Sequence, residues 1–295
     1  MKSIVFLTVL AMLAFAANSL LCRLALKFTA MDAATFTAIR LFSASAVLLV
    51  LTSWRSSTPH LEASAPAPFL ADKPSWRSEG SWPSAAALFV YAAGFSLAYV
   101  ELSAATGALL LFASVQVSMI GYGLFKGERF STVQMIGFLM ALAGVLLLML
   151  PGLAAPSLKS AALMILAGVA WGVYSIRGKG AKHPIAATTG NFVRTLPFTL
   201  VLSGAMLMQF SFSTAGAVYA LASGALASGL GYVIWYKVLP ALGATQAAVA
   251  QLSVPVIAAL GAVLFIGEAL SLTLLGASVA VLAGIGLVIW GRARD

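Results

Sequence analysis

The sequence predicts an all-α integral membrane protein with ten transmembrane helices, arranged as two inverted repeats of five helices. Three observations predict this class: an apolar composition, a series of apolar runs of membrane-spanning length, and a pattern that recurs along the chain. Of the 295 residues, 61% are hydrophobic and 8% are charged, whereas a soluble domain has about 25% charged residues. The apolar runs are continuous rather than alternating, which favours helices over a barrel.

The spans follow from hydropathy, because a helix needs about 20 mostly apolar residues to cross a bilayer. The predicted spans are 4–22, 34–53, 84–101, 104–125, 132–150, 160–177, 186–208, 215–236, 244–266 and 271–290. The first one follows Lys2 and contains Ala14-Phe15-Ala16, which also fits a signal peptide. We interpret it as a retained span because the stretch has a counterpart in the second half. Residues 53–82, rich in Ser, Pro and charge, predict a cytoplasmic loop without a fold of its own.

The Lys and Arg residues predict the orientation, because cytoplasmic loops are enriched in them. With both termini inside, twelve lie on the inner side and three, Arg23, Lys27 and Lys159, on the outer side. We therefore expect a multi-pass protein of the bacterial inner (cytoplasmic) membrane, surrounded by lipid, with both termini cytoplasmic. The net charge of +9 does not indicate a nucleic-acid partner, since the basic residues lie in short loops rather than in one cluster with aromatic residues.

A pattern in the first half of the chain recurs in the second half. Residues 124–128, Leu-Phe-Lys-Gly-Glu, correspond to residues 264–268, Leu-Phe-Ile-Gly-Glu, at an offset of 140. At an offset of 154, Arg23 corresponds to Arg177 and Arg40 to Arg194. The predicted domains are two five-helix repeats, 1–151 and 152–295. Because five is an odd number, the second repeat enters the membrane from the opposite side, as in many secondary transporters.

The motif Leu-Phe-x-Gly-Glu followed by a helix with Leu-Ala-Gly, present twice, resembles the drug/metabolite transporter superfamily in its ten-helix EamA-type branch. The resemblance covers nearly the whole chain and is strongest from Gly231 to Trp290. It implies a basket of helices around a central cavity, lined mainly by the first, third, fourth, sixth, eighth and ninth spans. Members include exporters of amino acids, among them aromatic ones, and of other small metabolites. Gln116 stands where the second half has Pro255, so a proline hinge is expected in the ninth span only.

Polar and aromatic side chains within the spans are the candidate substrate-binding residues, because polar groups at membrane depth usually face a cavity or a partner. The candidates are Asn18, Tyr91, Phe95, Tyr99, Gln116, Trp171, Tyr174, Tyr232, Trp235, Gln246 and Gln251. The rings suit an apolar or aromatic substrate, and the amides suit a carboxylate or zwitterion. An interhelical hydrogen bond is an equal alternative for each amide, and an aromatic belt also accounts for Tyr99 and Tyr236. Trp171, further inside its span, is the first candidate.

Two arginines lie within spans, Arg40 and Arg194, each about 10–15 Å from the end of its helix. Their functional interpretation is binding of a substrate carboxylate or phosphate. The structural interpretation is snorkelling, or hydrogen bonding to carbonyl groups of a neighbouring segment. Because the resemblance places the second span of each repeat away from the cavity, we expect the structural role for both.

The acidic residues lie in predicted loops or at the termini, and Glu101, at the outer end of the third span, is the only one near the membrane interior. A proton-driven pump usually keeps a carboxylate within the bilayer. Unless Glu101 dips into the cavity, we therefore expect uncoupled transport. Glu128 and Glu268 are expected to be acids at the starts of the helices that follow their Gly-Glu turns.

Several activities find no support in the sequence. The single cysteine, Cys22, excludes an intramolecular disulfide, and His60 and His183 lack metal-ligand spacing. No phosphate-binding loop or nucleophile–base motif is present, so we expect no enzyme, no cofactor, no metal and no ATPase partner. The predicted function is export of a small organic metabolite, foremost an amino acid, by alternating access. The alternatives are another class of metabolite (nucleotide, sugar or drug-like) and a structural or regulatory membrane subunit.

Overall fold

The computed structural model describes residues 2–57, 75–127, 129, 131–149, 156–179, 181–242 and 244–292. Within these residues the chain is all-helical, without a strand, and its helices form ten spans. The first seven are α1 (Lys2–Phe28), α2 (Ala33–Ser57), α3 (Trp82–Tyr99), α4 (Ala104–Phe125), α5 (Thr132–Met149), α6 (Leu158–Gly178) and α7 (Pro184–Ala205). The eighth consists of α8 (Thr214–Ala222), π-helix η4 (Ser223–Leu230) and α9 (Gly231–Val238). The ninth joins α10 (Ala244–Gly261) to π-helix η6 (Ala262–Ile266), and the tenth is α11 (Leu272–Arg292).

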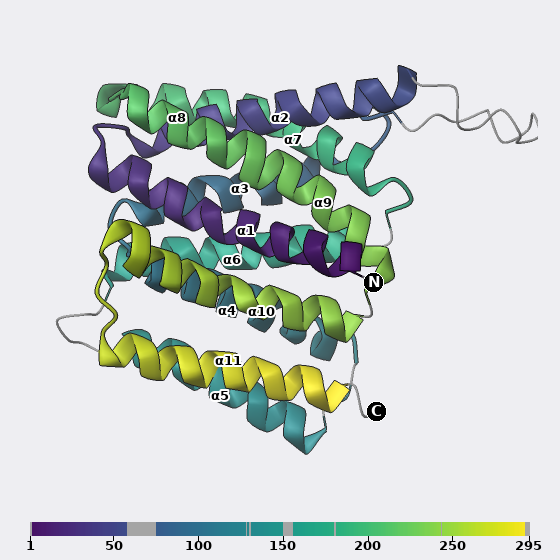
Figure 1. Cartoon of the computed structure of the whole chain (residues 1–295), viewed down its shortest axis with the longest axis vertical. Coiled ribbons are helices and arrows are strands. Elements are labelled where there is room, and N and C mark those ends of the chain that lie inside the picture. The colour runs from purple at the N-terminus through teal and green to yellow at the C-terminus, as the bar shows by residue number, and fades with distance from the viewer. Residues whose placement is uncertain are drawn as a thin grey trace, which may run out of the picture.

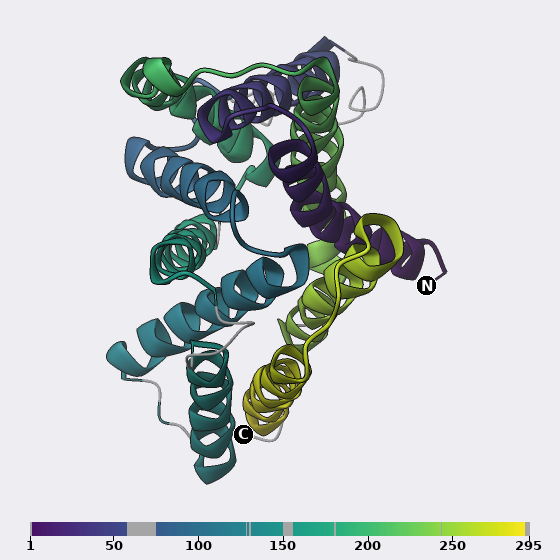
Figure 2. The ribbon, with the colours of Figure 1, turned by 90° about the vertical axis from the view of Figure 1, so that its left-hand side faces the viewer.

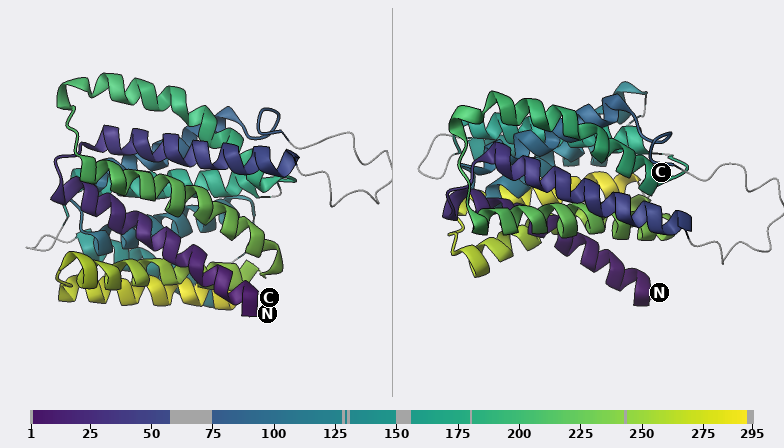
Figure 3. Two further views of the ribbon diagram at one scale, coloured as in Figure 1. Left: turned by 45° about the horizontal axis from the view of Figure 1, so that its top comes forward. Right: turned by 90° about the horizontal axis from the view of Figure 1, so that it is seen from above.

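The predicted all-α membrane fold is confirmed. Six helical stretches are long and apolar enough to cross a membrane by length and composition: 3–28, 33–54, 104–125, 158–178, 214–238 and 272–291. The shorter apolar stretches 132–147 and 250–266 complement them. The helices lie side by side, and the start of α1 and the end of α11 lie at the same edge of the bundle (Figures 1 and 3). The chain is a multi-pass membrane protein.

Helices of the first half of the chain pack against helices of the second half. Helix α1 packs on α8, α9 and α10 of the second half, whereas α6 packs on α3 and α4 of the first half. Helix α2 packs on α7, and α5 packs on α11. Viewed along the helices, α3 and α6 lie on the opposite side of the bundle from α1 and α10 (Figure 2). This reciprocal pattern is what two related five-helix units would produce, although the division at residues 151 and 152 stays a prediction.

Small residues allow the closest of these contacts. Gly137 of α5 lies directly against Gly284 of α11, and a Cβ atom on either one would collide with the backbone of the other helix. Gly168 of α6 lies in the same way against Leu111 and Ser114 of α4. In lipid no hydrophobic effect drives helices together, so the van der Waals contacts of such close backbone approach contribute much of the stability of helix association.

The loop predicted at 53–82 is structured at both ends. Helix α2 continues to Ser57, and residues 75–81 form turns that lead into α3. Asn191 of α7 accepts a hydrogen bond from the Ser81 backbone N–H at 2.8 Å, which fixes this segment to the second half. Residues 58–74 of the predicted loop lie outside the described residues.

Candidate functional site

A cluster of aromatic rings occupies the centre of the bundle, with Trp171 of α6 in its middle. The Trp171 ring lies 4.4 Å from Tyr91 of α3, 5.4 Å from Tyr232 of α9 and 6.2 Å from Tyr174, measured between ring centroids. Phe95, one helical turn after Tyr91, lies 5.6 Å from it. Other ring contacts extend the cluster to Phe15, Tyr99, Phe192, Trp235 and Tyr236. Offset and edge-to-face contacts at these distances stabilise a cluster beyond its buried area.

A small cavity of about 20 Å³ adjoins these rings, enough for about one water molecule. Its lining residues come from α1, α3, α4 and α6: Phe15, Asn18, Ser19, Tyr91, Phe95, Leu111, Phe112, Val115 and Trp171. The cavity therefore lies between the halves of the chain and is almost filled by side chains. A metabolite would need the rings to part, so the centre is closed in this conformation.

A buried hydrogen-bond chain links α1 to the π-helical segment η4. The Ser223 hydroxyl donates to Asn18 Oδ1 at 2.6 Å, and Asn18 Nδ2 donates to Ser228 Oγ at 3.3 Å. Residues five apart point roughly 140° apart in an α-helix, whereas the i to i+5 winding of a π-helix brings them near one face. The π winding thus turns both hydroxyls towards Asn18. Gly224 permits the approach of η4 to α2, because a Cβ there would collide with the Arg40 carbonyl and Ser43.

Arg40 of α2 lies at this centre and is only 2% exposed. Its Nη2 donates to the Tyr91 hydroxyl at 2.9 Å and its Nε donates to Ser228 Oγ at 3.3 Å. The guanidinium carbon lies 5.3 Å from the Tyr91 ring centroid and 4.9 Å from that of Phe95, within the range of cation–π attraction. In the described part of the chain neither its Nη1 nor the buried Tyr232 hydroxyl has a hydrogen-bond partner. The structure thus differs from the expectation that Arg40 lies apart from the site.

The repeat counterpart of Arg40 has the expected structural role. Arg194 of α7 donates from Nη1 to the Glu79 carbonyl at 2.8 Å and from Nη2 to the Arg77 carbonyl at 2.9 Å. It therefore holds the turns before α3, and within the described part of the chain it makes no hydrogen bond or cation–π contact with the rings around Trp171. The two arginines match in sequence position but not in surroundings.

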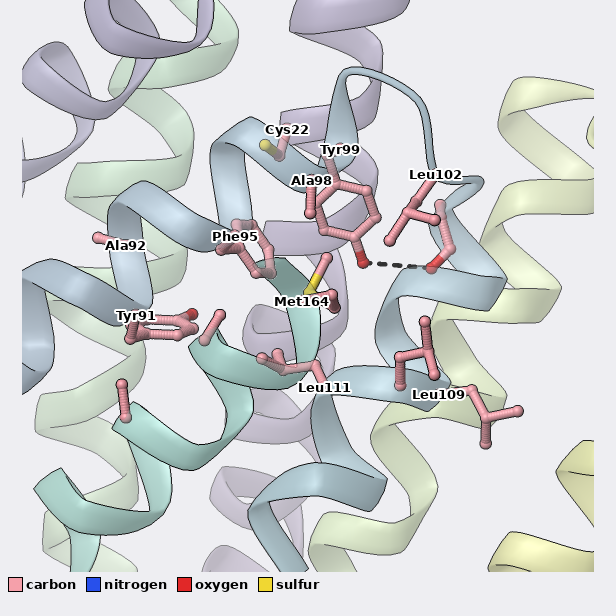
Figure 4. Packing of buried hydrophobic residues seen from close by; sticks show 14 of the residues in the cluster. Cys22, Tyr91, Ala92, Phe95, Ala98, Tyr99, Leu102, Leu109, Leu111 and Met164 are labelled. Carbon is pink, nitrogen blue, oxygen red and sulfur yellow. Dashed lines mark hydrogen bonds between the residues drawn. The ribbon is translucent and has the colours of Figure 1, made fainter. Parts of the chain in front are cut away.

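Four predicted site residues, Asn18, Tyr91, Phe95 and Trp171, line the cavity, and Tyr174 and Tyr232 contact Trp171. Tyr99 is buried behind Phe95, where its hydroxyl donates to the Ala104 carbonyl at 3.3 Å (Figure 4). Trp235 is buried in a neighbouring cluster with Ala11, Met12 and Val254. Gln116 and Gln251 are half-buried and do not line the cavity, and the Gln246 side chain lies outside the described residues.

Some residues of the site were not predicted from the sequence. Phe15 stands three residues before Asn18, and Ser19 directly after it, so the helical period of α1 could have found Phe15. Leu111, Phe112 and Val115 share a face of α4, but apolar residues surround them in sequence and give no signal. Ser223 and Ser228 stand among small residues and are brought to the site by a π-helix, which periodicity does not predict.

Pro255, the predicted hinge, is buried within α10. The helix continues for six residues past it to Gly261 and then widens into the π-helix η6. A proline inside a helix removes one backbone hydrogen bond, so two weak points follow each other in this span. Its role as a hinge stays a prediction.

A polar depression of about 440 Å³ opens at the end of the bundle opposite the chain termini. It is lined by Arg23, Lys27, Glu101, Leu102, Ser103, Thr106, Pro156, Ser157, Ile266, Gly267, Glu268 and Ala269. Glu101 is exposed there and accepts hydrogen bonds from the Ser157 and Ser160 hydroxyls, which lower the pKa of its carboxyl below the usual value. Glu101 thus lies at the rim and not in the central cavity.

Glu268 has a different place from the expected one. It accepts a hydrogen bond from the Ala104 backbone N–H, the first residue of α4, at 2.7 Å and pairs with Arg23 of α1. It therefore stands at the start of α4 and not of α11, the helix that follows it in sequence. Glu128, its repeat counterpart, lies outside the described residues. Within the part of the chain that the structure describes, no three His, Cys, Asp or Glu side chains gather as a metal site.

Comparison with known proteins adds the family context. The model of the EamA-like transporter family matches residues 158–290. An uncharacterized protein of Pseudomonas aeruginosa is 52% identical over 97% of this chain and 94% of its own length. An uncharacterized transporter of Archaeoglobus fulgidus is 26% identical over 69% of this chain and 74% of its own. A protein of known crystal structure covers 97% of both chains with a TM-score of 0.64 at 19% identity, a similarity of fold alone.

Proposed function

This chain belongs to the EamA-like transporter family, and from that premise we propose that it exports a small organic metabolite by alternating access. An amino acid, foremost an aromatic or apolar one, is the proposed substrate. The observation that carries the proposal is the central cavity, because aromatic rings and buried polar groups from both halves of the chain meet there. Transporters of inverted repeats bind their substrates near the midplane in such a position.

The ring cluster supports an apolar or aromatic substrate. Ligand sites in proteins are mostly apolar, with a few polar groups that fix the orientation of the ligand. Here Trp171, Tyr91 and Phe95 supply the apolar walls, and Asn18 with Ser228 supplies the polar groups. The polar depression lined by Arg23 and Glu101 is the proposed vestibule on the outer side.

The position of the acids supports uncoupled transport. The distribution of Lys and Arg supports the bacterial inner membrane as the location, with both termini cytoplasmic. The four acidic side chains in the described part of the chain are Asp32, Glu79, Glu101 and Glu268, and none lines the central cavity. A proton-coupled carrier needs a group in the transport path that gains and loses a proton. We therefore propose that the gradient of the substrate alone drives transport.

Flux into proteoliposomes tests the proposal. The purified protein is reconstituted, and counterflow is measured with a panel of radiolabelled amino acids, with and without a pH gradient. We expect saturable counterflow of at least one aromatic or apolar amino acid, at a rate that the gradient does not change. Counterflow of nucleotides or sugars alone would instead establish one of the other metabolite classes.

A non-transporting membrane subunit is tested by labelling. In a Cys22→Ser background, Asn18→Cys places the only thiol at the central cavity, and Ala277→Cys places it on the buried face of α11 that packs on Gly144 of α5. For a transporter we expect a water-soluble maleimide to label the Asn18→Cys protein in membranes and to spare the Ala277→Cys protein. Equal protection of both thiols would favour a subunit without alternating access.

A further inference from the structure

Arg40 is a buried cation at the centre of the bundle, and no acidic side chain among the described residues pairs with it. We propose that it binds the carboxylate group of the transported metabolite, whose apolar or aromatic body packs against the Tyr91, Phe95 and Trp171 rings. The substrate class would then be organic carboxylates, in which the carboxylate is required and an amino group is not. This inference rests on the proposed transport function and goes further by assigning the charged group of the site.

The charge balance around Arg40 is incomplete. An arginine keeps its proton in proteins, and a buried ion is costly unless a counter-ion and hydrogen bonds compensate for it. Among the described residues the one ion pair is that of Arg23 with Glu268, and the groups bonded to Arg40 are the neutral hydroxyls of Tyr91 and Ser228. A substrate anion would supply the missing charge.

The free donors match a carboxylate. The guanidinium is planar and presents parallel N–H groups that bind both oxygens of a carboxylate. Among the described residues the Nη1 group of Arg40 has no partner, and the adjacent Nη2 group, which carries two N–H donors, makes one hydrogen bond, to the Tyr91 hydroxyl. An unpartnered buried donor is uncommon in folded proteins and calls for an explanation, and a carboxylate absent from the structure provides one.

The surrounding rings connect this donor to the cavity. Tyr91 and Phe95, over which the guanidinium lies, both line the cavity with Trp171. The second unpartnered group, the Tyr232 hydroxyl, belongs to a ring that contacts Trp171. A ligand placed among these rings would therefore have a cation on the α2 side and a free hydroxyl on the α9 side.

The single positive charge favours a carboxylate over a phosphate and over an amine. No lysine and no second arginine is among the described residues that line the cavity or contact these rings, so a doubly charged phosphate would remain half compensated. No carboxylate lines the cavity to receive an ammonium group. Within one carbon skeleton we therefore expect the carboxylic acid to bind at least as tightly as the amino acid, and the amine to bind most weakly.

Thermal stabilisation of the purified protein in detergent gives the test, because a ligand that binds the folded state raises its melting temperature. Four probes share a phenyl ring: 3-phenylpropanoate, phenylalanine, 3-phenylpropanamide and phenethylamine. We expect both carboxylates to stabilise the wild-type protein and phenethylamine not to. Arg40→Gln should weaken carboxylate binding at least tenfold and leave amide binding unchanged. Arg40→Lys, which keeps the charge without the planar fork, should weaken it less.

Arg194→Gln is the matched control, since Arg194 occupies the corresponding position of the second repeat and bonds only backbone carbonyls in the structure. It should leave the affinity for all four probes unchanged. Equal carboxylate binding by wild type and Arg40→Gln would overturn the inference, and so would failure of both carboxylates to stabilise the wild type. If Arg40→Gln does not fold, the same comparison is decided by Arg40→Lys, in which an unchanged carboxylate preference over the amide would overturn it.

The inference and the proposed function fail in different ways. Flux of sugars or amines without any carboxylate binding would leave a transporter whose Arg40 does not bind substrate. Carboxylate binding that depends on Arg40, without flux of any solute, would confirm the site and contradict transport.

Discussion

Arg23 of α1 and Glu268, in the loop between η6 and α11, form a buried ion pair in which Nε lies 3.0 Å from Oε1, with both side chains less than a tenth exposed. Arg23 Nη1 also donates to the Tyr99 and Val100 carbonyls, each at 3.0 Å. Glu268 Oε2 accepts from the Ala104 N–H. The pair thus joins the end of α3, the start of α4 and the second half of the chain, and it closes the bundle at this end.

Removal of one partner of this pair should destabilise the protein strongly. Glu268→Gln leaves the Arg23 cation buried without a counter-ion, which costs about 3 kcal/mol by analogy with other buried pairs. We expect a clear fall in the melting temperature of the purified protein. Glu101→Gln, at an exposed carboxylate of the same depression, should change the melting temperature by much less.

The double variant separates the pair from its parts. Arg23→Gln with Glu268→Gln removes both charges, so we expect it to be more stable than Glu268→Gln alone, because no unpaired ion remains. Additive losses in the double variant would show that the two side chains stabilise the protein independently.

Ser228 accepts hydrogen bonds from both Asn18 Nδ2 and Arg40 Nε, so Ser228→Ala should leave two buried donors without a partner. Each unsatisfied group costs about 1–3 kcal/mol, and we expect a fall in thermal stability with a loss of flux. Ser45→Ala is the control, since Ser45 is equally buried but bonds only the Leu41 carbonyl of its own helix. Similar losses of thermal stability and flux in both variants would contradict this role of Ser228.

The helices and four of the nine residues that line the cavity could be predicted from local sequence. Hydropathy finds a span without knowledge of its neighbours, and the i to i+4 spacing of Tyr91 and Phe95 places both rings on one helix face. Asn18 was predicted because a polar side chain in mid-span needs a partner, and Trp171 because it lies too far inside its span for an interfacial aromatic belt.

The other features of the site could not be predicted, because they depend on contacts between segments that are distant in sequence. The contact between Arg40 and Ser228 depends on the π-helical winding of η4 and on Gly224, which lets η4 approach α2. Neither feature is visible in a pattern of apolar residues. Glu268 accepts a hydrogen bond from the Ala104 N–H, 164 positions away in the chain, so its neighbours in sequence did not indicate the helix at whose start it lies. Arg40 and Arg194 show that side chains at matching positions of a sequence repeat can have different surroundings.

Trp171→Ala should weaken substrate binding more than any other single ring substitution, because among the rings that line the cavity Trp171 contacts the most other rings, namely Tyr91, Tyr174 and Tyr232. A lost aromatic stack of about 1.4 kcal/mol corresponds to about a tenfold rise in the half-saturation concentration. Counterflow in proteoliposomes measures this rise. Trp82→Ala, at an exposed tryptophan at the start of α3, should leave it unchanged.

Flux should not respond to a pH gradient, because Glu101, the acid that the sequence places nearest the membrane interior, is held ionised. The Ser157 and Ser160 hydroxyls that bond the Glu101 carboxyl keep its pKa below the usual value. A carboxyl with a lowered pKa is ionised at all pH values above that pKa, so between pH 6 and pH 8 Glu101 takes up and releases no proton. We expect equal counterflow with and without an inward proton gradient, and equal rates for wild type and Glu101→Gln. A gradient that accelerates wild-type flux but not flux by Glu101→Gln would show that this carboxylate couples transport to protons and that the vestibule opens around it during the cycle.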